Sequence, residues 1–163
     1  MTPGGQRGRW RRWAIEIVAG LVAGFLGGFL CGIVGAIIGG NLGGPENPVA
    51  FGGMRGYEAT GVLGLIAGVV LGGSAGVYLG GQRSRVPGSY AATLMAAIVA
   101  VLVGAVLLLA SGGVKPGNWL LNTHPLMLPM VFGMTLLGSM LGFELARSRM
   151  QPAAGEVDQS PGL

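Results

Sequence analysis

Four long apolar stretches divide the chain, and short segments rich in glycine, proline and charged residues separate them. The stretches cover residues 14–40, 58–81, 90–110 and 124–146. Helices of about 20 residues or more, rising 1.5 Å per residue, are long enough to cross about 30 Å of hydrocarbon. The pattern predicts an all-α membrane protein whose four transmembrane helices form one compact bundle.

The first stretch follows an arginine-rich segment, as the apolar core of a secretory signal peptide does. A signal core has about 7–15 residues with a small-residue cleavage site after it, and this apolar run is nearly twice as long. We therefore expect a retained span. Residues 1–13 are interpreted as a basic and aromatic flexible N-terminal segment, and residues 147–163 as a disordered tail.

Positive charge is distributed unequally between the two sides that such a bundle would have. Eight of the ten Lys and Arg residues fall on one side: Arg7, Arg9, Arg11, Arg12, Arg83, Arg85, Arg147 and Arg149. Arg55 and Lys115 fall on the other. Because cytoplasmic segments collect cations, we expect both termini in the cytoplasm. No organelle transit pattern is evident, so the predicted location is the plasma (inner) membrane of a bacterium.

Composition agrees with a lipid environment. Charged residues make up 10% of the chain, against about 25% in soluble domains, which is too little to coat a water-exposed surface. The net charge of +4 does not indicate nucleic-acid binding, because the cations flank apolar stretches instead of forming one basic face interleaved with aromatic residues. The lipid bilayer, with anionic headgroups, is the predicted partner.

Glycine recurs at every fourth position in the first two stretches. The rows are Gly20, Gly24, Gly28 and Gly32 in the first, and Gly64, Gly68, Gly72, Gly76 and Gly80 in the second. In lipid, helices associate through close backbone approach more than through hydrophobicity, and small residues permit that approach. We predict that these glycines pack the two helices tightly together. Because a row of this spacing drifts about 40° per step, it requires a right-handed crossing or contacts with two neighbours.

Ionisable residues within the stretches lie near their cytoplasmic ends. Glu16 follows Arg12 by one helical turn, and Glu144 precedes Arg147 by three residues, so each pair can meet on a helix surface. The simpler interpretation is two ion pairs that anchor helix ends. The alternative is a paired carboxylate site for a cation or proton at the mouth of a pore.

Candidate catalytic chemistry is sparse. His124 is the single histidine and Cys31 the single cysteine, so one chain can form neither a multi-histidine metal site nor an internal disulfide. The glycine-rich segments lack the spacing and the preceding strand of a phosphate or dinucleotide loop. We therefore predict a protein without enzymatic activity, cofactor or metal.

Two hypotheses of function follow. The first is a non-catalytic accessory or structural subunit that assembles with itself or with a larger membrane complex. The second is a small channel or transporter with a pore lined by glycine backbone. A glycine groove serves tight packing and a narrow pore equally well, so the residues alone leave both open.

Overall fold

The computed structural model describes residues 4–43, 56–83, 88–110 and 127–150. These form four helices: α1 (Gly4–Gly43), α2 (Gly56–Arg83), α3 (Tyr90–Ala110) and α4 (Met127–Met150). Each is long and apolar enough to cross a membrane. The prediction of an all-helical chain with four such helices is confirmed for the described residues.

The largest differences from the expected helix ends are at the start of α1 and at the end of α4. α1 begins at Gly4 instead of near residue 14. No proline follows Pro3 in this segment, and its glutamine and arginines favour a helix, which offsets the three glycines at positions 4, 5 and 8. The segment 4–13 is therefore helix, not a flexible start. α4 continues to Met150, so residues 147–150 belong to the helix, which ends just before the residue that precedes Pro152. The rest of the predicted tail lies outside the described residues.

α4 is described from Met127 onwards. This start places Pro129 in the first turn, where the missing N–H would be unpaired in any helix. The predicted first residues of that span, including His124, lie outside the described part of the chain.

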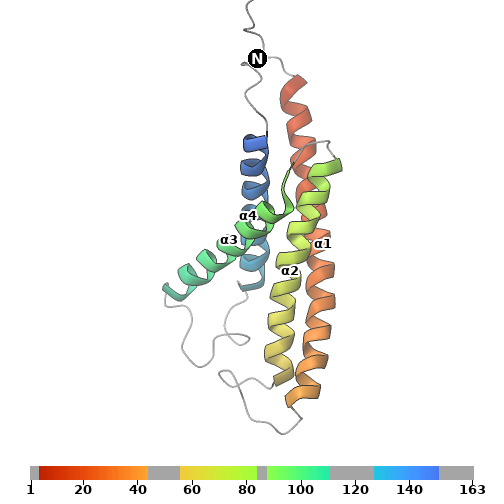
Figure 1. The fold of residues 1–163 in the computed structure, drawn as a ribbon, viewed down its shortest axis with the longest axis vertical. Helices are drawn as coiled ribbons and strands as arrows, with labels where there is room; N and C mark the ends of the chain where they lie inside the picture. Colours follow the sequence, from red (N-terminus) through yellow and green to blue (C-terminus); the bar gives the residue numbers. More distant parts are fainter. Residues whose placement is uncertain (1–3, 44–55, 84–87, 111–126, 151–163) are drawn as a thin grey trace, which may run out of the picture.

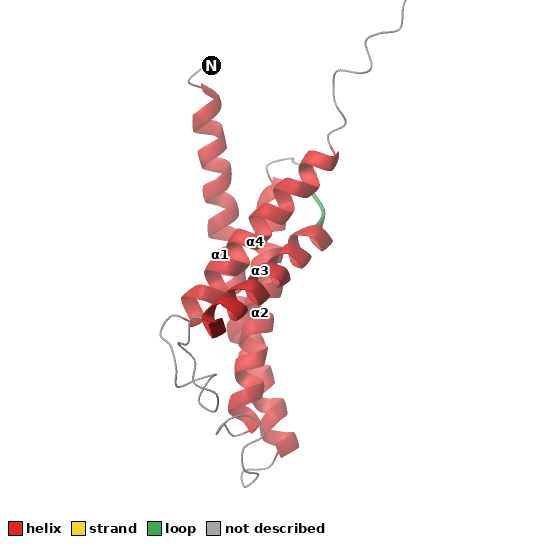
Figure 2. Ribbon diagram, turned by 90° about the vertical axis from the view of Figure 1, so that its left-hand side faces the viewer, coloured by secondary structure: helices red, strands yellow, loops and turns green. Residues whose placement is uncertain are grey.

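α1 and α2 run side by side along most of their length, and α4 packs against both (Figure 1). α3 packs on α4 and on α2 and then leaves the bundle obliquely. Within the described residues α1 and α3 do not contact each other. Figure 2 shows that the first turns of α1 extend beyond the neighbouring helices.

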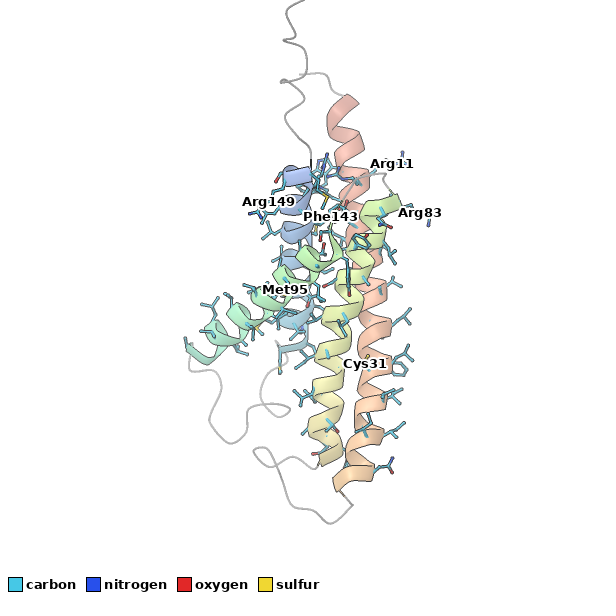
Figure 3. All side chains as sticks on the ribbon, in the orientation of Figure 1. Arg11, Cys31, Arg83, Met95, Phe143 and Arg149 are labelled. Carbon is cyan, nitrogen blue, oxygen red and sulfur yellow. The ribbon has the colours of Figure 1, made fainter. Side chains whose placement is uncertain are left out.

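The beginning of α1 and of α3 and the end of α2 and of α4 lie at one end of the bundle. This end carries Arg11, Arg12, Arg83, Arg147 and Arg149 and is called the arginine end below. Figure 3 shows three of these side chains, those of Arg11, Arg83 and Arg149, at that end. Tyr78 and Tyr90 also meet there, with ring centroids 5.6 Å apart, and join α2 to α3.

The interior of the bundle is made mostly of small and medium-sized residues. Phe143 is the largest fully buried side chain among the described residues. The other buried residues include the polar Ser74, Thr135 and Ser139 and the apolar Val69 and Val77. Large apolar side chains instead cover the outside, as the following examples from α1 and α3 illustrate: Val22, Phe25, Phe29, Ile33, Leu102 and Val106. Large apolar residues are mostly buried in water-soluble proteins, so this distribution is the reverse of theirs.

Candidate functional site

The glycines of α2 that recur every four residues lie against α1 along its length. The nearest atom to a methyl group added at each of these glycines would be a backbone atom of α1: of Cys31 for Gly64, Gly27 for Gly68, Ala23 for Gly72, Ala19 for Gly76 and Glu16 for Gly80. At Gly68, a Cβ atom would overlap the carbonyl oxygen of Gly27. The two backbones are therefore closer than any larger side chain would allow.

The residues of α1 that lie closest to these glycines are not the predicted glycine row. It consists of Ala19, Ala23, Gly27 and Cys31, one residue before each glycine of the predicted row. This row also repeats every four residues in the sequence. It was not predicted because it contains alanine and cysteine, whereas the adjacent row consists of glycine alone. Contact between i±4 rows on both helices is a common form of helix packing.

The predicted row on α1 lies at the edge of the same interface. Gly28 and Gly32 approach Val69 and Leu65 of α2. Gly20 and Gly24 approach α2 at Gly73 and also reach α4, since a methyl group at Gly20 would meet Leu136 and one at Gly24 would meet Phe132. The α1 row thus contacts two helices, whereas the α2 row contacts one.

A second small-residue contact joins α3 to α4. Methyl groups added at Gly138 and Gly142 would meet the backbone carbonyls of Ala96 and Ala92, together with neighbouring alanine methyl groups. Nearby, the buried ring of Phe143 lies over Gly81 at the end of α2 and over Gly88 just before α3. Phe143 therefore packs α4 against the α2–α3 connection; Figure 3 labels it.

At the arginine end, four charged side chains form one cluster. Arg12 Nε lies 3.3 Å from Glu16 Oε1 on α1, and Arg147 Nη1 lies 3.3 Å from Glu144 Oε2 on α4. The sequence suggested both of these within-helix pairs. It did not suggest the contact that joins them, in which Arg12 Nη2 donates to Glu144 Oε1 at 2.6 Å.

Burial differs sharply between the two carboxylates of this cluster. The side chain of Glu16 is 1% exposed, whereas that of Glu144 is 39% exposed. Glu16 Oε1 has no hydrogen-bond donor of suitable geometry within the described residues, so its contact with Arg12 is mainly electrostatic. Two cations and two carboxylates balance in formal charge, and removing Arg12 would leave Glu16 without its nearest counter-charge.

Hydroxyl groups occupy the interior between α2 and α4. Ser74 Oγ and Ser139 Oγ share a hydrogen bond of 3.2 Å. One turn earlier on α4, Thr135 is buried, and its Oγ1 has no hydrogen-bond partner among the described residues. On α3, Thr93 Oγ1 donates to the carbonyl of Ser89 at 2.8 Å. The Ser74–Ser139 bond stabilises the contact of α2 with α4, and the Thr93 bond stabilises the first turn of α3. None of these four hydroxyls is placed beside a base as a nucleophile would be.

In the part of the chain that the structure describes, no group of three or more His, Cys, Asp or Glu side chains comes together. Cys31 is half-buried at the α1–α2 contact, close to the position that a methyl group at Gly68 would occupy. Comparisons of the chain with protein-family models, with curated proteins and with solved structures find no match.

Proposed function

We propose that this chain is an integral protein of a bacterial plasma membrane, with four spans and both termini in the cytoplasm. Two observations support the proposal: the apolar outer surface of all four helices and the gathering of arginines at one end of the bundle. The apolar outer surface would lie in the hydrocarbon. The arginine end would face the cytoplasm, because cytoplasmic segments of membrane proteins are enriched in Lys and Arg.

A reporter fused after Gln151 tests this topology. A reporter active only in the cytoplasm should function there, and one active only in the periplasm should not. The reciprocal pattern would overturn the orientation, and release of the protein from membranes by alkaline carbonate would overturn membrane insertion itself.

Within the membrane, the function best supported is that of a non-catalytic accessory or structural subunit. The observation that carries it is the close contact of the two small-residue rows. The backbone of α1 fills the groove along the α2 glycines, which leaves no space for a pore along them within one chain. In lipid, such close contacts with their dispersion energy supply the adhesion that hydrophobicity cannot. The apolar outer faces of α1 and α3 then remain for lipid, for a second copy or for other subunits.

A small transporter is the second candidate, and one specific observation favours it. The side chain of Glu16 is buried, and its Oε1 lacks a hydrogen-bond donor of suitable geometry within the described residues. Buried carboxylates in membrane helices often mark ion or proton pathways. In this hypothesis Glu16 and Glu144 together handle a cation or proton at the cytoplasmic mouth.

Two measurements separate the hypotheses. The mass of the complex, purified gently from its native membrane, should include unrelated subunits if the protein is accessory to a larger assembly, whereas a symmetric ring of copies would favour a pore. The double substitution Glu16→Gln and Glu144→Gln should preserve the assembly of an accessory subunit. Loss of solute flux by a folded, assembled double variant would refute the accessory function.

A further inference from the structure

A cavity opens between α3 and α4 at the arginine end, beside the small-residue contact of these two helices described above. Its volume is about 360 Å³, within the range of about 300–1,000 Å³ that small-molecule sites occupy. Small residues line it along both helices: Ala92, Ala96, Gly142 and Ala146. The lining is predominantly apolar, so its interior suits hydrocarbon better than a polar solute.

The polar groups of the cavity are gathered at its arginine end. Arg149, in the last turn of α4, and Ser89, which precedes the first residue of α3, both line it. Unlike Arg12 and Arg147, Arg149 has no ion-pair or hydrogen-bond partner for its side chain among the described residues. Its guanidinium can therefore bind an anion without breaking an existing contact.

The beginning of α3 adds to this preference for negative charge. Ser89 caps the helix, with the Ala92 N–H 3.4 Å from Ser89 Oγ. The positive end of the helix dipole of a 21-residue helix thus lies at the same rim as Arg149. The cavity combines an apolar interior with a rim complementary to an anion.

We propose that this cavity, lying between α3 and α4, binds an anionic phospholipid of the cytoplasmic leaflet, with its phosphate at Arg149 and part of one acyl chain in the small-residue groove. The inference rests on the proposed membrane insertion and orientation, which place the rim at headgroup depth. A lipid explains both halves of the cavity at once.

The test compares two lipids that differ only in their headgroup. The full chain, purified in mild detergent, is mixed with equal amounts of dioleoyl phosphatidylglycerol and dioleoyl phosphatidylcholine, and the bound ratio is measured by native mass spectrometry. We expect the native chain to favour phosphatidylglycerol by about fivefold, the contribution of one cation near an anionic headgroup. Arg149→Gln should reduce the ratio to about one, while Arg11→Gln, which removes an exposed arginine of α1 at the same end, should leave it unchanged.

A second pair of variants tests the groove. Ala92→Leu narrows the cavity and should lower the binding of both lipids several-fold, whereas Ala67→Leu, on an exposed position of α2, should not. Circular dichroism checks that each variant retains its helices. If Ala92→Leu does not fold, the comparison of Arg149→Gln with Arg11→Gln still tests the lipid site. Equal binding of both lipids by the native chain, or equal losses from Arg149→Gln and Arg11→Gln, would overturn the site. Extraction of the native chain by alkaline carbonate would instead refute the membrane proposal.

Discussion

Arg12 on α1 and Glu144 on α4 are joined by a hydrogen-bonded ion pair of 2.6 Å, although 132 positions separate them in the sequence. The same guanidinium lies 3.3 Å from the buried carboxylate of Glu16. One arginine therefore neutralises a carboxylate in the interior and also ties the first helix to the last. These two roles depend on different partners and can be separated by substitution.

Arg12→Gln should destabilise the protein by about 2–3 kcal/mol, somewhat less than the loss expected for breaking a fully buried pair. The physical reason is that Glu16 would remain buried without its nearest cation. Glu144→Gln should cost only about 0–1 kcal/mol, because that carboxylate is substantially exposed. Thermal or denaturant unfolding in a fixed detergent measures both changes.

The matched control is Arg11→Gln, which removes a neighbouring exposed arginine and should be close to neutral. Adding Glu16→Gln to Arg12→Gln should restore part of the lost stability, since the uncompensated charge is then gone. If the double variant is less stable than Arg12→Gln alone, burial of the Glu16 charge is not the cause of the loss.

Gly68→Ala tests the closeness of α1 and α2. The new methyl group would overlap the Gly27 carbonyl oxygen, so the two backbones must separate, at an expected cost of about 1–3 kcal/mol. Gly133→Ala on α4 is the matched control, because a methyl group there meets nothing within 4 Å. Since alanine favours helix over glycine, Gly133→Ala should stabilise by about 0.5–1 kcal/mol. Equal effects of the two substitutions would contradict the close contact at Gly68.

Much of this fold follows from the order of apolar and polar residues. Four apolar stretches predict four helices, because the length and composition of each stretch are local properties of the chain. Spacing alone also indicated the partners of Glu16 and Glu144 on their own helices. Residues three and four apart on a helix must be neighbours, so these contacts need no knowledge of the tertiary structure.

The contacts between helices were harder to predict from the sequence. The regularity of Gly20, Gly24, Gly28 and Gly32 suggested the contact row of α1, yet the row that meets the α2 glycines starts at Ala19 and includes Cys31. A shift of one residue rotates the interface by about 100°, and only the position of the neighbouring helix decides which of two adjacent small rows lies closest. The link from Arg12 to Glu144 depends in the same way on tertiary structure.

Gly81 and Phe143 provide a test of side-chain complementarity. A methyl group at Gly81 would enter the space of the Phe143 ring, and this ring is fully buried, so Gly81→Ala should destabilise by about 1–3 kcal/mol. Phe143→Leu shortens the side chain and should partly rescue Gly81→Ala, although alone it costs stability through the cavity that it creates. A double-mutant cycle on thermal unfolding measures the coupling, and simple additivity of the two losses would show that ring and glycine are not in contact.

Thr135 offers the reverse case, a substitution that should stabilise. Its Oγ1 is buried without a hydrogen-bond partner among the described residues, and a buried hydroxyl in that state costs about 1–3 kcal/mol. Thr135→Val replaces the hydroxyl by a methyl group of similar size and keeps the β-branched shape, so we expect a gain of about 1 kcal/mol. Thr93→Val, on the equally buried hydroxyl that donates to Ser89, should instead lose about 0.5–1.5 kcal/mol, the usual net value of one hydrogen bond. Both changes are measured as shifts of the unfolding midpoint in the same detergent. A loss of stability for Thr135→Val comparable to that of Thr93→Val would mean that the Thr135 hydroxyl is hydrogen-bonded in the membrane-embedded protein, and the interior between α2 and α4 would then have to contain a polar group facing it.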